Sequence, residues 1–214
     1  NKPEAISLFE SKASQIGSDF SVKSLPAKYP QGAEKVLIYN CTGRVVPAGK
    51  LPLDVGAVVC NLGTSFAIYE AVVKNKPLFE RVVTISGEAI NSPKNVIAPI
   101  GTKISDLIAY AGGTKDDFRE LVSGGPMMGF AVSDEETPMV KGTSGILALP
   151  LLVEDKTFPC VSCGRCTAHC PMGLQPNKMF RNIKNGNYQA AMDMNLMDCK
   201  ECGCCAYSCP SHLP

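Results

Sequence analysis

Residues 1–78 alternate between helical and extended hydrophobic patterns. Apolar positions that recur every three or four residues predict three helices, and a glycine follows each of the first two. The predicted helices span residues 3–16, 34–41 and 64–74. In the third helix we expect Phe66, Tyr69 and Val73 to point inward. Strands expected from alternating or continuous apolar runs span residues 19–25 and 55–60. Helices and strands that follow one another in this way are typical of an α/β domain.

Residues 81–130 form a tighter succession of short elements. The predicted strands of this stretch span residues 81–86, 96–99 and 120–123. A helix over residues 103–111 separates the second strand from the third and ends at two glycines. Two strands, a helix and a returning strand suggest a small β-grasp-like module. After it, the acidic residues 133–141 are expected to be a surface loop, and residues 145–152 a strand that leads back to the body of the protein.

The composition is that of a folded protein with a substantial core. Of 214 residues, 45% are hydrophobic and 19% are charged, which excludes an intrinsically disordered chain. The 21 Lys and Arg residues nearly balance 20 Asp and Glu residues, and no basic stripe suggests nucleic-acid binding. No apolar run approaches membrane-spanning length. The chain begins at Asn1 without an initiator methionine or a signal peptide, so we expect it to be part of a longer protein.

The cysteines are concentrated near the C-terminus. Of eleven cysteines, nine lie between Cys160 and Cys209. Disulfides in a secreted protein are more often spread along the chain to join its loops. The clustering therefore indicates a metal site in a reducing compartment.

Eight of these cysteines form an internal repeat of the pattern C-x-x-C-x-x-C-x-x-x-C-P. This is the pattern of bacterial two-cluster ferredoxins, in which three cysteines of a run bind one [4Fe–4S] cluster and the fourth binds the other. Gly164 and Gly203 let the backbone wrap closely, and Pro171 and Pro210 end the helix that follows. For the first cluster we predict the ligands Cys160, Cys163, Cys166 and Cys209. For the second cluster we predict the ligands Cys199, Cys202, Cys205 and Cys170.

A pair of zinc sites is the alternative interpretation of this repeat. Zinc is usually bound by two C-x-x-C pairs and has no use for a third cysteine and a C-x-x-x-C-P tail. Helical patterns over residues 176–184 and 188–194 lie between the runs and indicate a helical ferredoxin domain. We therefore predict two [4Fe–4S] clusters, and we find no catalytic triad elsewhere in the chain.

Together with the cysteine repeat, three further motifs resemble one family closely. They are Tyr29-Pro30-Gln31-Gly32-Ala33-Glu34-Lys35, Gly124-Gly125-Pro126-Met127-Met128-Gly129 and Lys141-Gly142-Thr143-Ser144-Gly145. The chain resembles, over essentially its whole length, the C subunit of the Rnf complexes, which are ion-translocating ferredoxin:NAD⁺ oxidoreductases.

The resemblance implies three domains and a flavin site. It implies the C-terminal part of a complex-I-like FMN- and NADH-binding domain, an SLBB module, a connecting loop and strand, and a two-cluster helical ferredoxin domain. The expected boundaries are 1–78, 79–132, 133–156 and 157–214. The flavin-lining residues that it implies are Gly32, Ala33, Glu34, Asn61 and Thr64. The glycine-rich segment that completes the FMN and NADH site in this family is expected upstream of Asn1.

The function that the resemblance implies is an electron relay. Electrons pass between NAD(H) and FMN, through two [4Fe–4S] clusters, to membrane subunits linked to ferredoxin. The flavin converts hydride chemistry into single-electron steps. The implied location is the cytoplasmic face of a bacterial cell membrane, without a span in this chain. The alternative is a cobalamin-reductase-type or microcompartment flavo-iron–sulfur protein of the same layout.

Overall fold

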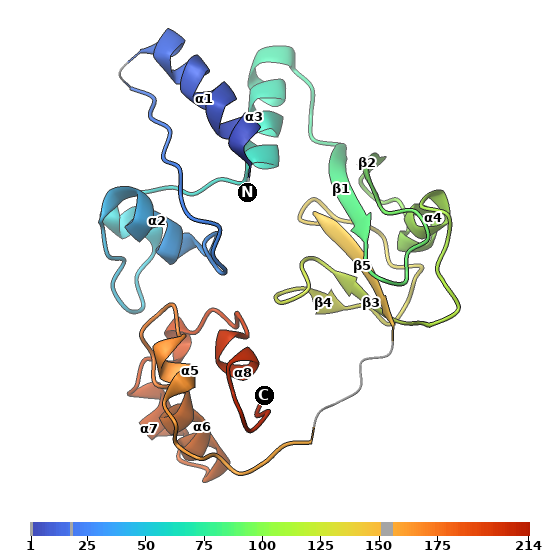
Figure 1. Cartoon of the computed structure of the whole chain (residues 1–214). Coiled ribbons are helices and arrows are strands. Elements are labelled where there is room, and N and C mark those ends of the chain that lie inside the picture. The colour runs from blue at the N-terminus through green and yellow to red at the C-terminus, as the bar shows by residue number, and fades with distance from the viewer. Residues whose placement is uncertain (1, 18, 151–155) are drawn as a thin grey trace. The chain divides into compact units, whose positions relative to one another are not determined.

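The computed structural model describes residues 2–17, 19–150 and 156–214 (Figure 1). The chain divides into two compact units, and each unit combines segments that are far apart in the sequence. The first unit comprises Asn1–Val59 and Gly164–Lys200. The second comprises Cys60–Cys163 and Glu201–Pro214.

The second unit contains a mixed five-stranded sheet in the order β2-β1-β5-β3-β4 (Figure 1). Its strands are β1 (Glu80–Ser86), β2 (Lys94–Pro99), β3 (Phe118–Ser123), β4 (Phe130–Ala131) and β5 (Gly145–Pro150). β5 is parallel to β1 and antiparallel to β3. Together with helix α4 (Ile104–Tyr110), this sheet confirms the predicted β-grasp-like module.

The place of β5 differs from the sequence-based expectation. The sequence predicts that the strand over residues 145–152 leads back to the body of the protein as part of a connecting segment, but β5 lies in the middle of the module's sheet. Strand order depends on pairing between distant segments, which a local hydrophobic pattern does not encode. The last two residues of the predicted strand, Leu151 and Leu152, lie outside the described residues.

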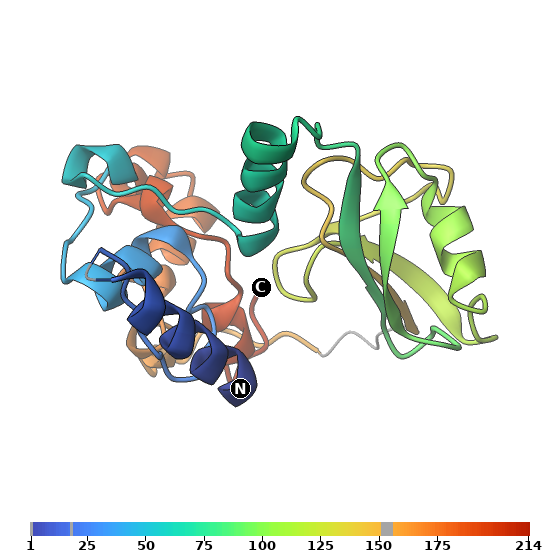
Figure 2. The same cartoon turned by 90° about the horizontal axis from the view of Figure 1, so that it is seen from above.

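The core of the module lies between the sheet and α4, which covers one face of the sheet (Figure 2). Period-two alternation in β1 buries Val83 and Ile85 completely, while Val82 on the other face is 60% exposed. Helix α4 contributes Ile104, Leu107 and Ile108 to the same cluster. The predicted acidic surface loop is confirmed as a loop, although Met139 within it is buried in this core.

The turn after β1 requires a glycine. Gly87 has a φ of 111°, and a Cβ at this position would lie 2.1 Å from the carbonyl oxygen of Ala148 in β5. Both the conformation and the close approach exclude a side chain. Gly87 therefore permits the turn that ends β1.

The helices predicted for the N-terminal region are confirmed. They are α1 (Pro3–Ile16), α2 (Glu34–Thr42) and α3 (Leu62–Lys74), and a short 3₁₀ turn η1 (Pro52–Val55) lies between α2 and α3. A left-handed Gly43 ends α2, with its N–H donating to the carbonyl of Tyr39 at 2.8 Å. Local capping chemistry is sufficient to define these ends.

Two predicted strands and one predicted orientation are wrong. Residues 19–25 and 55–60 form no strand in the part of the chain that the structure describes. An extended apolar run becomes a strand only if a neighbouring strand completes its hydrogen bonds, and the five described strands all follow Pro77 in the sequence. On α3, the side chains expected to point inward, Phe66, Tyr69 and Val73, are all exposed.

The C-terminal region is helical, as predicted. Its elements are α5 (Arg165–Ala168), α6 (Pro176–Lys184), α7 (Tyr188–Met192), η2 (Leu196–Asp198) and α8 (Cys204–Tyr207). α6 packs against α7, and Met179 and Ala191 are buried (Figure 1). None of the described helices is both long enough and apolar enough to cross a membrane.

Candidate iron–sulfur and flavin site

The two cysteine runs share one local backbone conformation. Gly164 and Gly203 are both left-handed, with φ and ψ of 77° and −3° and of 73° and −3°, and each directly precedes a four-residue helix. Two residues earlier, Ser162 and Glu201 are also left-handed, with φ of 54° and 51°. Left-handed non-glycine residues are uncommon. The sequence repeat is therefore also a structural repeat, including its unusual positions.

The fourth cysteine occupies the same place in each repeat. The N–H of Cys170 donates to the carbonyl of Thr167 at 3.3 Å, and the N–H of Cys209 donates to that of Ala206 at 3.0 Å. Both cysteines thus follow the short helix in the same turn. The first run also provides a backbone donor to sulfur, since the N–H of Ser162 donates to Sγ of Cys160 at 3.4 Å. Such N–H···S bonds tune the potential of iron–sulfur clusters, so the residues present fit the predicted group.

The predicted ligands are distributed over both units. The first unit contains Cys166, Cys170 and Cys199, whereas the second contains the other five. Across residues 2–17, 19–150 and 156–214, no three His, Cys, Asp or Glu side chains form a group that could hold a metal ion. The two sets of four ligands therefore remain a prediction from the sequence.

Within the second unit, Ser211 joins the two ends of the cysteine region. The N–H of Phe158 donates to the carbonyl of Ser211 at 2.9 Å, and the Ser211 hydroxyl donates to the carbonyl of Pro159 at 3.0 Å. Ser211 is buried. The segment just before Cys160 and the segment just after Cys209 thus lie side by side. This arrangement favours a shared cluster for those two cysteines.

Within the first unit, an ion pair joins α2 to the residue before Cys199. Nζ of Lys35 lies 2.9 Å from Oδ1 of Asp198, and the two side chains are only 11% and 13% exposed. Lys35 also donates to the carbonyl of Pro47 at 3.3 Å. The hydrogen bond from Lys35 is the main reason that the pKa of Asp198 lies below its ordinary value. No local sequence pattern relates the two positions, so the sequence alone does not predict this pair.

The residues predicted to line a flavin lie at the starts of two helices. In the first unit, Glu34 is the first residue of α2, Ala33 is its N-cap, and Gly32 directly precedes that cap. Asn61 caps α3 in the second unit, with its side chain accepting from the N–H of Gly63 at 2.9 Å, and Thr64 lies in the first turn. Helix starts present backbone N–H groups that suit anionic parts of a ligand. Their role toward FMN remains a prediction.

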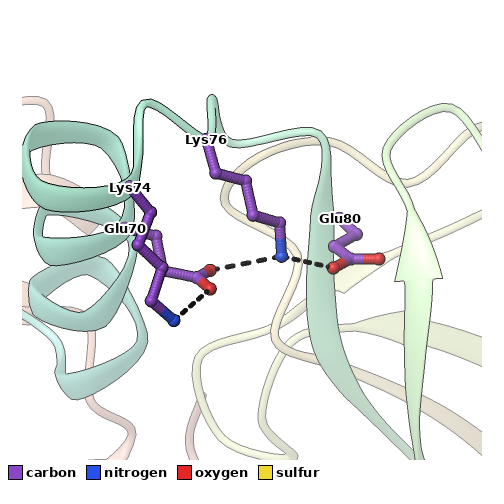
Figure 3. Close-up of polar contacts among 4 residues, drawn as sticks. All are labelled: Glu70, Lys74, Lys76 and Glu80. Atoms are coloured by element: carbon purple, nitrogen blue, oxygen red, sulfur yellow. Dashed lines mark hydrogen bonds and ion pairs between the residues drawn. The ribbon is translucent and has the colours of Figure 1, made fainter.

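A cavity of about 430 Å³ in the second unit extends from Asn61 along α3 to β1. Its charged lining includes a triplet centred on Lys76, whose Nζ lies 3.4 Å from Oε2 of Glu70 and 2.8 Å from Oε1 of Glu80 (Figure 3). The hydrogen bond to Glu80 is the main cause that raises the pKa of Lys76. This triplet joins α3 to the sheet. No sequence pattern predicts this triplet, because Lys76 lies in the connection between α3 and β1.

Three family models match successive parts of the chain. A Nuo51 FMN-binding domain matches residues 1–70, an SLBB domain matches residues 82–131, and a 4Fe-4S dicluster domain matches residues 152–210. These matches agree with the three kinds of domain that the resemblance implied.

Curated relatives match 92% of the chain. One is the C subunit of the proton-translocating ferredoxin:NAD(+) oxidoreductase complex of Clostridium ljungdahlii, 50% identical, of which the chain covers 44%. The C subunit of the ion-translocating oxidoreductase complex of Rhodobacter capsulatus is 43% identical and 38% covered. The C subunit of the Na(+)-translocating ferredoxin:NAD(+) oxidoreductase complex of Acetobacterium woodii is 41% identical and 45% covered. The chain spans less than half the length of these relatives, and over that part it is similar to the C subunits of ion-translocating oxidoreductase complexes.

Proposed function

We propose that this chain is the electron-relay part of the C subunit of an ion-translocating ferredoxin:NAD⁺ oxidoreductase complex. The observation that carries the proposal is the duplicated cysteine run with its duplicated backbone conformation. The names of the relatives support the assignment to this kind of complex.

The eight repeat cysteines would hold two [4Fe–4S] clusters. In this proposal the ligand sets are crossed, so that Cys209 completes the set of the first run and Cys170 that of the second. The contacts of Ser211 support the crossing, because they hold the entry to Cys160 beside the exit from Cys209. When bound, the clusters accept and release single electrons. The protein keeps the thiolates in position and directs backbone N–H groups, such as that of Ser162, toward sulfur.

The N-terminal part would contribute one side of an FMN site. The proposed contacts are Gly32, Ala33, Glu34, Asn61 and Thr64. In the whole protein, NAD(H) would exchange a hydride with the flavin, and the clusters would connect the flavin to other subunits and indirectly to ferredoxin. We place the protein peripherally, on the cytoplasmic face of the bacterial membrane. The expected domain boundaries at residues 78, 132 and 156 belong to this proposal.

Metal analysis of anaerobically purified protein tests the proposal directly. Two four-iron clusters predict about eight iron atoms and about eight acid-labile sulfides per chain. Cys202→Ser should lower both contents and change the EPR spectrum of the reduced protein. Cys60→Ser, outside the repeat, is the matched control and should leave both unchanged. Stoichiometric zinc without sulfide would overturn the proposal.

A further inference from the structure

The loop from Gly124 to Gly129 contacts the second cysteine run. This loop joins β3 to β4, and its sequence is one of the motifs that carry the family resemblance. A Cβ on Gly203 would lie 2.9 Å from the terminal methyl carbon, Cε, of Met127. Both residues belong to the second unit. The thioether end of Met127 therefore lies directly against the backbone of the cysteine run.

The sheet holds this loop in place. The N–H of Gly124 donates to the carbonyl of Gly145 at 2.8 Å, and the N–H of Gly129 donates to that of Gly125 at 2.8 Å. A Cβ on Gly129 would lie 2.4 Å from Val122 and 2.6 Å from the carbonyl oxygen of Gly125. The glycines thus allow a tight double turn that projects from β3. This rigid base positions Met127.

Met127 contacts the residue next to Cys202, the cysteine that is most shielded from solvent. Of the eleven cysteines, all within the described ranges, Cys202 alone is buried. It directly precedes Gly203, the residue that Met127 contacts. Met127 itself is 41% exposed, so its side chain lies at the boundary between solvent and the run. A flexible, apolar thioether is well suited to fill such an irregular gap.

We propose that the Gly124–Gly129 loop covers the cluster of the second cysteine run, with Met127 as a positioning residue that limits water access. This inference rests on the proposed function, since it requires a cluster. A cluster held by four thiolates is anionic, and reduction adds further negative charge. Excluding water disfavours the more highly charged state. The cover therefore holds the potential of this cluster more negative than it would be in contact with solvent.

Redox-titrated EPR of the reconstituted protein tests the cover. In Met127→Ala, the midpoint potential of one cluster should shift to a less negative value, and that cluster should lose iron to a chelator faster. The other cluster should keep its potential. Met127→Leu preserves the apolar volume and should restore the wild-type potential, which a change in overall folding would not do. Met128→Ala, at the next position, is the matched control and should shift neither cluster.

Alanine substitutions at two equivalent glycines, Gly203 and Gly164, provide a second, independent test of the cover. Gly203→Ala and Gly164→Ala impose a similar backbone strain, but only at Gly203 would the new methyl group meet Met127. Gly203→Ala should therefore accelerate iron release more than Gly164→Ala does, and adding Met127→Ala should reduce that difference. Equal potentials in wild type and Met127→Ala would overturn the cover while leaving the proposed function intact. Absence of any cluster from the wild type would overturn the proposed function itself.

Discussion

Lys35 and Asp198 are 163 residues apart in the sequence, and their side chains form a hydrogen-bonded ion pair of 2.9 Å. Lys35 lies in α2, within the part that matches the FMN-binding family, and Asp198 directly precedes the ligand candidate Cys199. The pair therefore links the flavin-related segment to the second cysteine run. Because both side chains are largely shielded from solvent, removing either one would leave the other charge shielded and unpaired, which costs more than breaking a surface ion pair.

A double-mutant cycle measures this link. Lys35→Met and Asp198→Asn should each lower the free energy of unfolding by about 1–3 kcal/mol, because each leaves a shielded polar partner unsatisfied. The double variant should lose less than the sum of the two, as expected for residues in contact. Chemical denaturation under anaerobic conditions provides the values. The exposed pair of Lys103 and Glu136 is the control and should show much weaker coupling; strictly additive losses at Lys35 and Asp198 would argue against the link.

Alkaline pH should weaken the attachment of α3 to the sheet. The pKa of Lys76 is raised above 10.5, chiefly by its hydrogen bond to Glu80, so its charged form is favoured in the folded state. A raised folded-state pKa stabilises the protein below the unfolded-state pKa, and this stabilisation is lost as pH rises through the folded-state pKa. The difference in melting temperature between wild type and Lys76→Met should therefore be constant near neutral pH and shrink above pH 10.5. A difference that does not change with pH would show that the triplet adds no charge-dependent stability.

The close approach at Gly87 should make this position intolerant of alanine. Gly87→Ala combines a positive φ with a direct overlap on Ala148, so we expect a loss of about 4 kcal/mol or more, or failure of the module to fold. Gly101 has a similar φ of 98°, but a Cβ at that position would meet no atom within 4 Å. Gly101→Ala should thus cost only the backbone strain, about 1–2 kcal/mol. Urea denaturation compares the two, and equal losses would exclude a role for the overlap.

The crossed ligand sets predict how single cysteine changes act. Cys209→Ala should damage the same cluster as Cys163→Ala, and Cys170→Ala the same cluster as Cys202→Ala. EPR spectra of the four variants make the comparison. The measurements should be repeated in a Cys204→Ser background, because the thiol of Cys204 could replace a lost neighbour. If Cys209→Ala instead matches Cys202→Ala, each run completes its own cluster.

Local chemistry in the sequence determined the helices and the candidate metal site. The ends of α1 and α2 were predictable because glycines stop helices through short-range hydrogen bonds. The candidate metal ligands were equally predictable, because the spacing of the cysteine repeat reflects ligand geometry over a few residues. Its duplicated backbone, including the left-handed Gly164 and Gly203, follows from the same local pattern.

Only the tertiary structure decided which distant segments meet. Apolar residues 19–25 and 55–60 have strand-like patterns, yet a strand requires a partner that these patterns cannot specify. The central place of β5 likewise depends on pairing with β1 and β3. The contacts of Lys35 with Asp198 and of Met127 with Gly203 join positions without any shared periodicity. Such contacts arise from the packing of whole elements, so local sequence patterns do not predict them.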